Sequence, residues 1–275
     1  MIRRLWLENE NGQVYSFSDQ TECMAASLQN FGIETSMTYF EYETSYQPAT
    51  SKMAMTKPSM VLHLMKGYEG YSKLVAFLYQ SQDLKLYYES NDLKYIYVDV
   101  ASLTKQELSG PNYLQTTITF NKKSLWMKEY NVTINEETVN NTKAYDYSYD
   151  YEYADVVGNE ITITNRGSVP APINIQITGR LENPLIQVFS NDQIVSQCKV
   201  NVNSNNGTLL IKSEEGHEAM ELTENDVTRN VYQEQDFTMD GFIYAPVGSN
   251  TIKIMPGSGA KYIYNLTFHE LYRGN

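Results

Sequence analysis

Short segments of alternating apolar and polar residues recur along the whole chain. Residues 14–17 follow an Asn-Gly step, which is a strong hairpin signal, and strand-like spacing continues at 33–46 and 59–65. Further segments bounded by Gly, Pro, Asn or Asp predict strands at 84–89, 94–104, 113–120, 160–165, 171–179, 184–190, 193–201, 208–213, 241–244, 250–255 and 261–270. Short strands at regular spacing are typical of β-sandwiches and jelly rolls.

One segment, residues 67–79, has the period of a helix instead. Its apolar face would be formed by Tyr71, Leu74, Val75 and Leu78. Between Pro48 and Pro58 no pattern is sustained, and proline discourages a central strand, so we expect a loop there. The predicted fold class is mainly β, with one α-helix in the N-terminal half.

Charge divides the chain into two parts. The 275 residues carry 21 basic and 33 acidic side chains, a net charge of −12. Residues 1–130 hold 12 basic and 14 acidic side chains, net −2, and the remainder holds 9 and 19, net −10. Because the net charge changes after Trp126, we expect two domains, 1–130 and 131–275, with Trp126 packed at their junction. A pI near 4.8 argues against a protein whose main task is to grip nucleic acid.

No motif points to catalysis, a cofactor or a metal. Of the three histidines, His63 lies on a predicted strand, where it belongs on the polar face. Gly257 and Gly259 flank Ser258 without the Lys and Ser/Thr of a phosphate loop. Cys23 and Cys198 are expected to be reduced, buried thiols. No apolar run is long enough to cross a bilayer and no secretory apolar core is present, so neither membrane insertion nor export is expected.

Two acidic segments leave alternatives open. Residues 145–153 alternate tyrosine with acidic or Ser residues, which predicts a strand with a tyrosine face for packing or, alternatively, a sugar platform. The second segment is expected to be a solvated loop, and its acids are Glu214, Glu215, Glu218, Glu221, Glu224 and Asp226. Paired carboxylates could serve glycoside hydrolysis, and hard oxygens could bind calcium, but neither segment has the required spacing.

Several strings in order resemble the distal tail protein family of siphophages. They are 7–15 (LENENGQVY), 68–78 (YEGYSKLVAFL), 97–107 (YVDVASLTKQE), 119–126 (TFNKKSLW), 161–168 (ITITNRGS), 179–184 (GRLENP) and 248–252 (GSNTI). No single string is diagnostic, but their order spans nearly the whole chain. The acidic segment 213–226 departs from the shorter, less charged connection expected in this family.

The resemblance implies a structural hub of a phage tail tip or baseplate, and no enzyme. Residues 1–130 would form a β-sandwich belt domain that assembles into a homohexameric ring, and 131–275 a galectin-like β-sandwich. Implied partners are the tail tube protein, a tail-associated lysin or tail-fibre-type hub protein and a receptor-binding protein. DNA would pass through the ring unbound, and the protein would be assembled in the host cytoplasm and reside in the virion.

From the residues themselves we nominate two interaction sites. A ring-interface ribbon would contain Tyr39, Tyr42 and Tyr46, and the acidic segment 214–226 would be an outer docking loop that recruits an adhesin. The alternative functions are a carbohydrate-binding protein that contacts the host cell surface, which would use the sandwich and its tyrosines, and a hydrolase, which would use the carboxylates.

Overall fold

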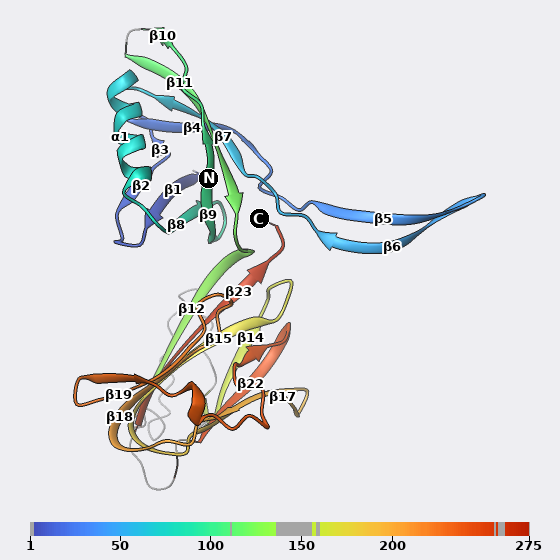
Figure 1. Cartoon of the computed structure of the whole chain (residues 1–275), viewed down its shortest axis with the longest axis vertical. Helices are drawn as coiled ribbons and strands as arrows, with labels where there is room; N and C mark the ends of the chain where they lie inside the picture. The colour runs from blue at the N-terminus through green and yellow to red at the C-terminus, as the bar shows by residue number, and fades with distance from the viewer. Residues whose placement is uncertain are drawn as a thin grey trace, which may run out of the picture. The chain divides into compact units, whose positions relative to one another are not determined.

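The computed structural model describes residues 3–110, 112–135, 156–157, 160–255, 257 and 262–274 (Figure 1). The fold is mainly β, as predicted, and α1 (Gly67–Tyr79) is the one α-helix of the described residues. The chain forms two compact units, Met1–Lys128 with Tyr272–Asn275, and Glu129–Leu271. Strand β12 (Trp126–Asn135) begins in the N-terminal unit and continues in the C-terminal unit.

The N-terminal unit is built on one antiparallel sheet with strand order β2-β1-β8-β9-β11-β7-β4-β3, and β10 pairs with β11. The strands are β1 (Arg4–Asn9), β2 (Val14–Ser16), β3 (Ser18–Asp19), β4 (Cys23–Gln29), β7 (Ser59–Leu64), β8 (Leu84–Glu89), β9 (Leu93–Leu103), β10 (Leu108–Gly110) and β11 (Tyr113–Lys122). The Phe17 N–H donates to the Leu5 carbonyl on β1, and the Phe17 carbonyl accepts from Ala25 on β4, both at 2.8 Å. Phe17 therefore links strands near the opposite ends of this order.

Alternation along these strands builds the N-terminal core. On β11 every second residue from Leu114 to Lys122 is buried, and β7 buries Met60, Leu62 and Leu64. Helix α1 contacts β7 and β11, and its Leu74 is fully buried in the same core. His63 is half-buried between its buried neighbours on β7, on the polar face as predicted.

The C-terminal unit is a sandwich of two antiparallel sheets. One has the order β20-β19-β18-β15-β23 with β21 beside β15 and β12 beside β23; the other has the order β13-β14-β22-β16-β17. Their strands are β13 (Val156–Val157), β14 (Glu160–Asn165), β15 (Ala171–Glu182), β16 (Leu185–Ser190), β17 (Gln193–Lys199), β18 (Asn203–Lys212), β19 (Ala219–Glu224), β20 (Val227–Asn230), β21 (Tyr244–Ala245), β22 (Gly248–Met255) and β23 (Tyr262–Tyr272).

A single apolar core lies between these two sheets. Ile175 and Leu266 of one sheet and Ile186 and Ile252 of the other belong to the same buried cluster. Cys198 joins this cluster, and Cys23 lies in the N-terminal core. Both cysteines are free and buried, as predicted, and burial raises the pKa of each thiol to about 12.

The acidic segment differs from the solvated loop that its composition predicts. Glu214, Glu215 and Glu218 precede β19, but Glu221 and Glu224 lie on this strand, and Asp226 is in the turn to β20. Met220 and Leu222 are fully buried and alternate with the exposed side of β19, which is the pattern of a strand with one face on a core. The high density of carboxylates concealed this two-residue period. The tyrosine segment 145–153 lies outside the described residues.

Candidate functional site: an exposed hairpin arm

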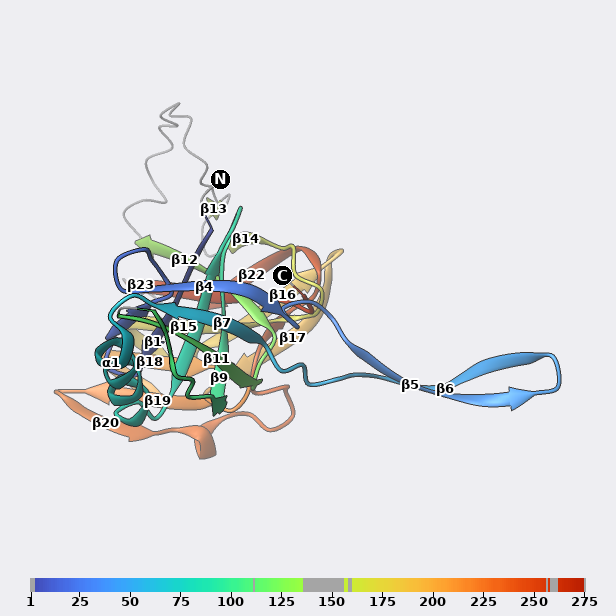
Figure 2. The same ribbon diagram turned by 90° about the horizontal axis from the view of Figure 1, so that it is seen from above.

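A long hairpin extends from the sheet of the N-terminal unit (Figures 1 and 2). It consists of β5 (Thr35–Tyr42) and β6 (Ser45–Met53), which form a two-stranded sheet of their own. We call residues 35–53 the arm. Every residue from 32 to 52 is exposed, so the arm has no core within this chain. An isolated two-stranded hairpin is only marginally stable in water, which directs attention to what could cover it.

The root of the arm is firmly held by the N-terminal unit. Phe31, just before the arm, packs its ring 5.8 Å from both Trp126 and Tyr88. The buried indole of Trp126 donates through Nε1 to the Phe31 carbonyl at 3.1 Å. On the return strand, the Ala54 N–H donates to the Glu34 carbonyl at 2.9 Å. The arm therefore leaves a rigid base on both of its strands.

Pro48 lies inside β6, where the sequence predicts the start of a loop. The pairing slips between Thr38 and Tyr39, which face Thr50 and Pro48, so the arm contains a bulge at Ala49. In a two-stranded ribbon each strand has one unpaired edge, and proline is tolerated at edges and bulges. The predicted loop at 47–58 is therefore wrong for residues 47–53, which continue as a strand.

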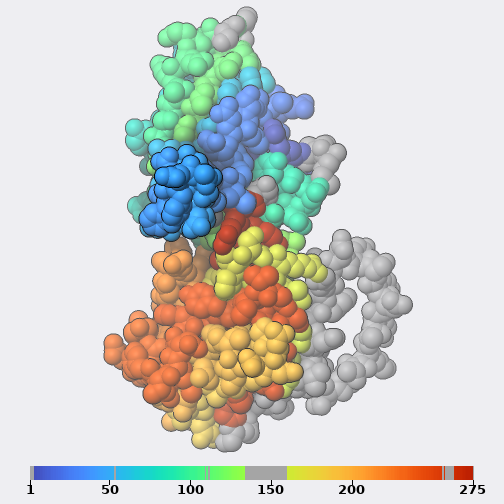
Figure 3. All heavy atoms as spheres, turned by 90° about the vertical axis from the view of Figure 1, so that its right-hand side faces the viewer, coloured from blue at the N-terminus to red at the C-terminus, as the bar shows by residue number. Residues whose placement is uncertain are grey.

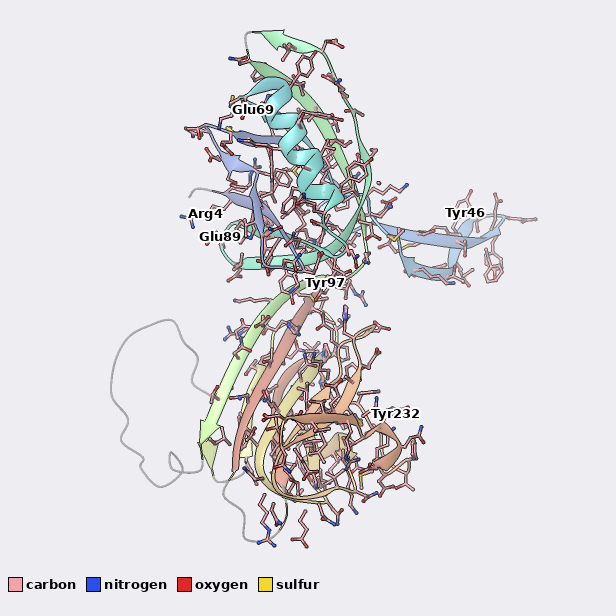
Figure 4. All side chains as sticks on the ribbon, turned by 60° about the vertical axis from the view of Figure 1, so that its left-hand side comes forward. Arg4, Tyr46, Glu69, Glu89, Tyr97 and Tyr232 are labelled. Atoms are coloured by element: carbon pink, nitrogen blue, oxygen red, sulfur yellow. The ribbon has the colours of Figure 1, made fainter. Side chains whose placement is uncertain are left out.

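The arm carries large apolar side chains on both of its faces. Their exposed fractions lie between 48% and 67%, and the residues are Met37, Tyr39, Phe40, Tyr42 and Tyr46. Tyr39, opposite Pro48, shares one face with Met37, whose sulfur accepts a bond from the Tyr39 hydroxyl at 3.1 Å. Phe40 and Tyr42 lie on the other face, because successive strand residues point to opposite sides. Figure 4 shows Tyr46 near the tip, and the arm stands towards the viewer in Figure 3.

The three predicted ribbon tyrosines, Tyr39, Tyr42 and Tyr46, all lie on the arm and are exposed. Sequence reasoning left Phe40 out of this set, although its 62% exposure makes it one of the most accessible large apolar side chains of the arm. The signal was available, because Phe40 is two residues from Tyr42 and therefore lies on the same face of the strand.

The other side chains considered for catalysis or metal binding do not form a site in the described part of the chain. The His63 Nδ1 hydrogen-bonds the Tyr113 hydroxyl on the neighbouring strand. Within the described residues no three His, Cys, Asp or Glu side chains are grouped so that they could hold a metal ion. No helix of the described part of the chain is long and apolar enough to span a bilayer.

The comparisons with known proteins agree with this architecture. Residues 4–123 match the family model of the distal tail protein N-terminal domain. A chain from the phage P2 baseplate in its activated conformation with calcium has a TM-score of 0.66 at 13% identity, over 96% of this chain and 98% of that one. The crystal structure of the SPP1 Dit protein, described as a hub adsorption apparatus in phages infecting Gram-positive bacteria, gives 0.65 at 12% identity, over 97% and 98%.

A comparison with curated protein sequences gives no match. At identities of 12–13% the two structures establish the fold, and the family model carries the assignment of the N-terminal unit. The family model bears out the resemblance drawn from the sequence strings within residues 4–123, and the two structures bear out the fold over nearly the whole chain.

Proposed function

We propose that this chain, whose residues 4–123 match the distal tail protein N-terminal domain, is a member of the distal tail protein family and the structural hub of a phage tail tip or baseplate. In this role it forms a hexameric ring that joins the tail tube to the tail-associated lysin or fibre-type hub protein and docks the receptor-binding protein. The observation that carries the proposal is the exposed arm with apolar side chains on both faces.

An arm of this kind favours burial against other chains. A hairpin that only lies on a surface alternates apolar and polar faces, because one face meets water. Here Tyr39 and Phe40 point to opposite sides, so covering a single face would leave the other in water. Contiguous exposed apolar surface on a soluble protein commonly marks an interaction site. We therefore place the arm between two surfaces in the assembled particle.

A closed ring uses exactly such a pair of unlike surfaces, since each subunit repeats one heterologous contact around the axis. The arm would be the donor surface, and the body of the next N-terminal unit the acceptor. The rigid root at Phe31 and Trp126 would fix the direction in which the donor is presented. The net charge of −12 suits a ring through which DNA passes, because a cationic lumen would retain phosphate.

The C-terminal sandwich is proposed to dock the adhesin, with the acidic segment 214–226 facing the partner. The carbohydrate-binding alternative gains no support from a hollow of about 270 Å³ at the surface of this unit. Sugar sites place aromatic faces in a concavity, whereas this one is lined by Arg180, Leu181, Glu182, Asn203, Ser204 and Asn205.

The ring is tested with the full chain and a variant that combines Phe40→Ala and Tyr46→Ala. Light scattering of the wild-type protein should report about 190 kDa, six times the 31.6 kDa chain, and averaged electron images should show a central hole. The double variant should remain folded and become largely monomeric, because two arm anchors on opposite faces are removed.

Tyr79→Ala is the matched control, because Tyr79 on α1 is 88% exposed in the same unit but lies outside the arm. This variant should assemble like the wild type. A protein that is monomeric both free and inside purified tails, or a double variant that still forms rings of wild-type stability, would contradict the proposed role of the arm.

A further inference from the structure

Three aromatic side chains form a cluster at the surface of the C-terminal unit. Tyr232 belongs to the short 3₁₀ helix η2 (Tyr232–Glu234) and lies at the surface (Figure 4). Its ring centroid is 6.1 Å from that of Phe242, which stacks on it, and 6.0 Å from that of Phe237, which meets it edge-on. Phe237 is 63% exposed, whereas Phe242 packs against the core. The cluster therefore has a buried base and an open top.

The segment that carries this cluster is fixed to the edge of β17. The Asp236 N–H donates to the Lys199 carbonyl at 2.9 Å, and the Asp240 N–H donates to the Gln197 carbonyl at 3.1 Å. In return, the Gln197 N–H donates to Oδ2 of Asp240 at 2.9 Å. Because Phe237 lies between these two attachment points, its ring is presented by an ordered segment, which lowers the entropy lost on binding a partner.

The surroundings of the cluster are strongly acidic. Residues 214–245 contain nine Asp or Glu and one Arg, a net charge of 1 − 9 = −8. That single cation, Arg229, is paired with Glu234 through both guanidinium nitrogens. Hydrogen bonds from Thr238 keep the pKa of Asp236 below its usual value, so this carboxylate beside Phe237 is ionised at neutral pH.

We propose that the Tyr232–Phe237–Phe242 cluster is the centre of the adhesin dock and receives a polypeptide segment that carries Arg and apolar side chains. The inference deepens the proposed docking function and rests on it. An Arg side chain can stack on an aromatic face while its charge meets the acidic surroundings, and exposed aromatic groups supply most of the affinity in many interfaces. The carboxylates of 214–226 then steer the partner and set the salt dependence.

A cationic polypeptide fits this surface better than a glycan does. The most exposed ring of the cluster, that of Phe237, has no polar atom for sugar hydroxyls, so the Tyr232 hydroxyl is the one polar side-chain group of the three rings. The wall polymers of many bacteria are polyanions, which the acidic surface repels. Charge complementarity thus selects the partner, and the aromatic rings select where it binds.

The experiment measures binding of the full chain to a short fluorescent peptide of alternating Arg and Trp. In two control peptides, Arg is replaced by Glu or Trp is replaced by Ala. A soluble fragment of host wall glycan is tested in parallel. We expect saturable binding of the first peptide, weakened by added salt, and little binding of the counterparts. Phe237→Ala should weaken the affinity about tenfold or more, the effect of removing a central aromatic anchor.

Tyr79→Ala is the control, because Tyr79 on α1 is an exposed aromatic residue, 88% against 63% for Phe237, that lies outside both the arm and the cluster. It should leave peptide binding unchanged, while Phe237→Ala should leave ring assembly unchanged. A wild-type chain that forms no rings but still binds the peptide would contradict the hub proposal alone. The proposed dock would be overturned if the two variants weakened peptide binding equally or if no peptide bound saturably. It would also be overturned if the Glu peptide bound as well as the Arg peptide, or if the glycan fragment bound in a way that needs Phe237.

Discussion

The β5–β6 arm and the β16–β17 hairpin are both antiparallel hairpins with one register shift, yet their burial is opposite. The arm exposes all of its described side chains, whereas the second hairpin buries Ile186, Val188 and Cys198. The second hairpin pairs with β22 and packs on a facing sheet, and the arm has neither in its own chain. Pairing and alternation therefore do not decide burial; a second layer does, and for the arm we propose that another molecule supplies it.

The largest loss of stability is expected for a substitution at the root of the arm. Trp126→Ala should lower the free energy of unfolding by about 3–5 kcal/mol, because a fully buried indole is removed and its bond to the Phe31 carbonyl is lost. Urea unfolding followed by circular dichroism measures this loss. Trp126→Phe keeps a ring in the core and should cost clearly less; equal losses for the two variants would contradict the packing argument.

In the β16–β17 hairpin, the stability lost on substitution by alanine should depend on how deeply each side chain is buried. Ile186→Ala should cost about 2–5 kcal/mol of unfolding free energy, because it leaves a cavity in the C-terminal core. Ile194→Ala on the paired strand is the control, since Ile194 is 48% exposed, and it should change stability by no more than about 0.5 kcal/mol. Similar losses at both positions would show that this hairpin is not half-buried as described.

The buried thiols make stability depend on alkaline pH. Burial raises the pKa of Cys23 and Cys198 to about 12, whereas an unfolded thiol titrates near pH ~8.5. Above that value the unfolded state releases the proton that the native state keeps, so stability falls as pH rises towards 12. Each thiol contributes at most about 1.4 kcal/mol per pH unit.

Unfolding free energies of the wild type and of Cys198→Ala, measured from neutral pH upwards, isolate the contribution of one thiol. The variant should show a shallower decline than the wild type, whatever its stability at neutral pH. Identical slopes would mean that Cys198 is not shielded from water in solution.

The smallest effect is expected on the arm itself. At protein concentrations low enough to dissociate the proposed ring, Phe40→Ala should change the unfolding free energy by less than about 0.5 kcal/mol, because its side chain is 62% exposed and little packing is lost. Thermal unfolding at low protein concentration tests this. A loss comparable to that of Ile186→Ala would reveal that the arm folds back on its own unit.

Much of the fold follows from local pattern. The helix, the first hairpin and strands such as β8 and β14 lie where the sequence predicts them, because each combines a clear period with turn residues at its ends. Strands β19 and β20 were missed because carboxylates dominate their composition, although Met220 and Leu222 keep the period of two.

The candidate sites were less accessible to sequence reasoning. The tyrosines of 33–46 indicated a ribbon, but alternation looks the same whether a face is buried by its own chain or by a partner. The aromatic cluster brings Tyr232 and Phe242 together across a turn with no period at all. It depends on backbone bonds to β17, which no local pattern encodes.

The return of Tyr272–Asn275 to the N-terminal unit imposes an order on biosynthesis. The ammonium of Lys94 lies 4.3 Å from the centre of the Tyr272 ring, and a Cβ at Gly274 would lie only 2.8 Å from Cγ1 of Ile33, beside the root of the arm. A ribosome produces these residues after the entire C-terminal sandwich. The surroundings of the arm's base are therefore completed only by the last residues to be synthesised.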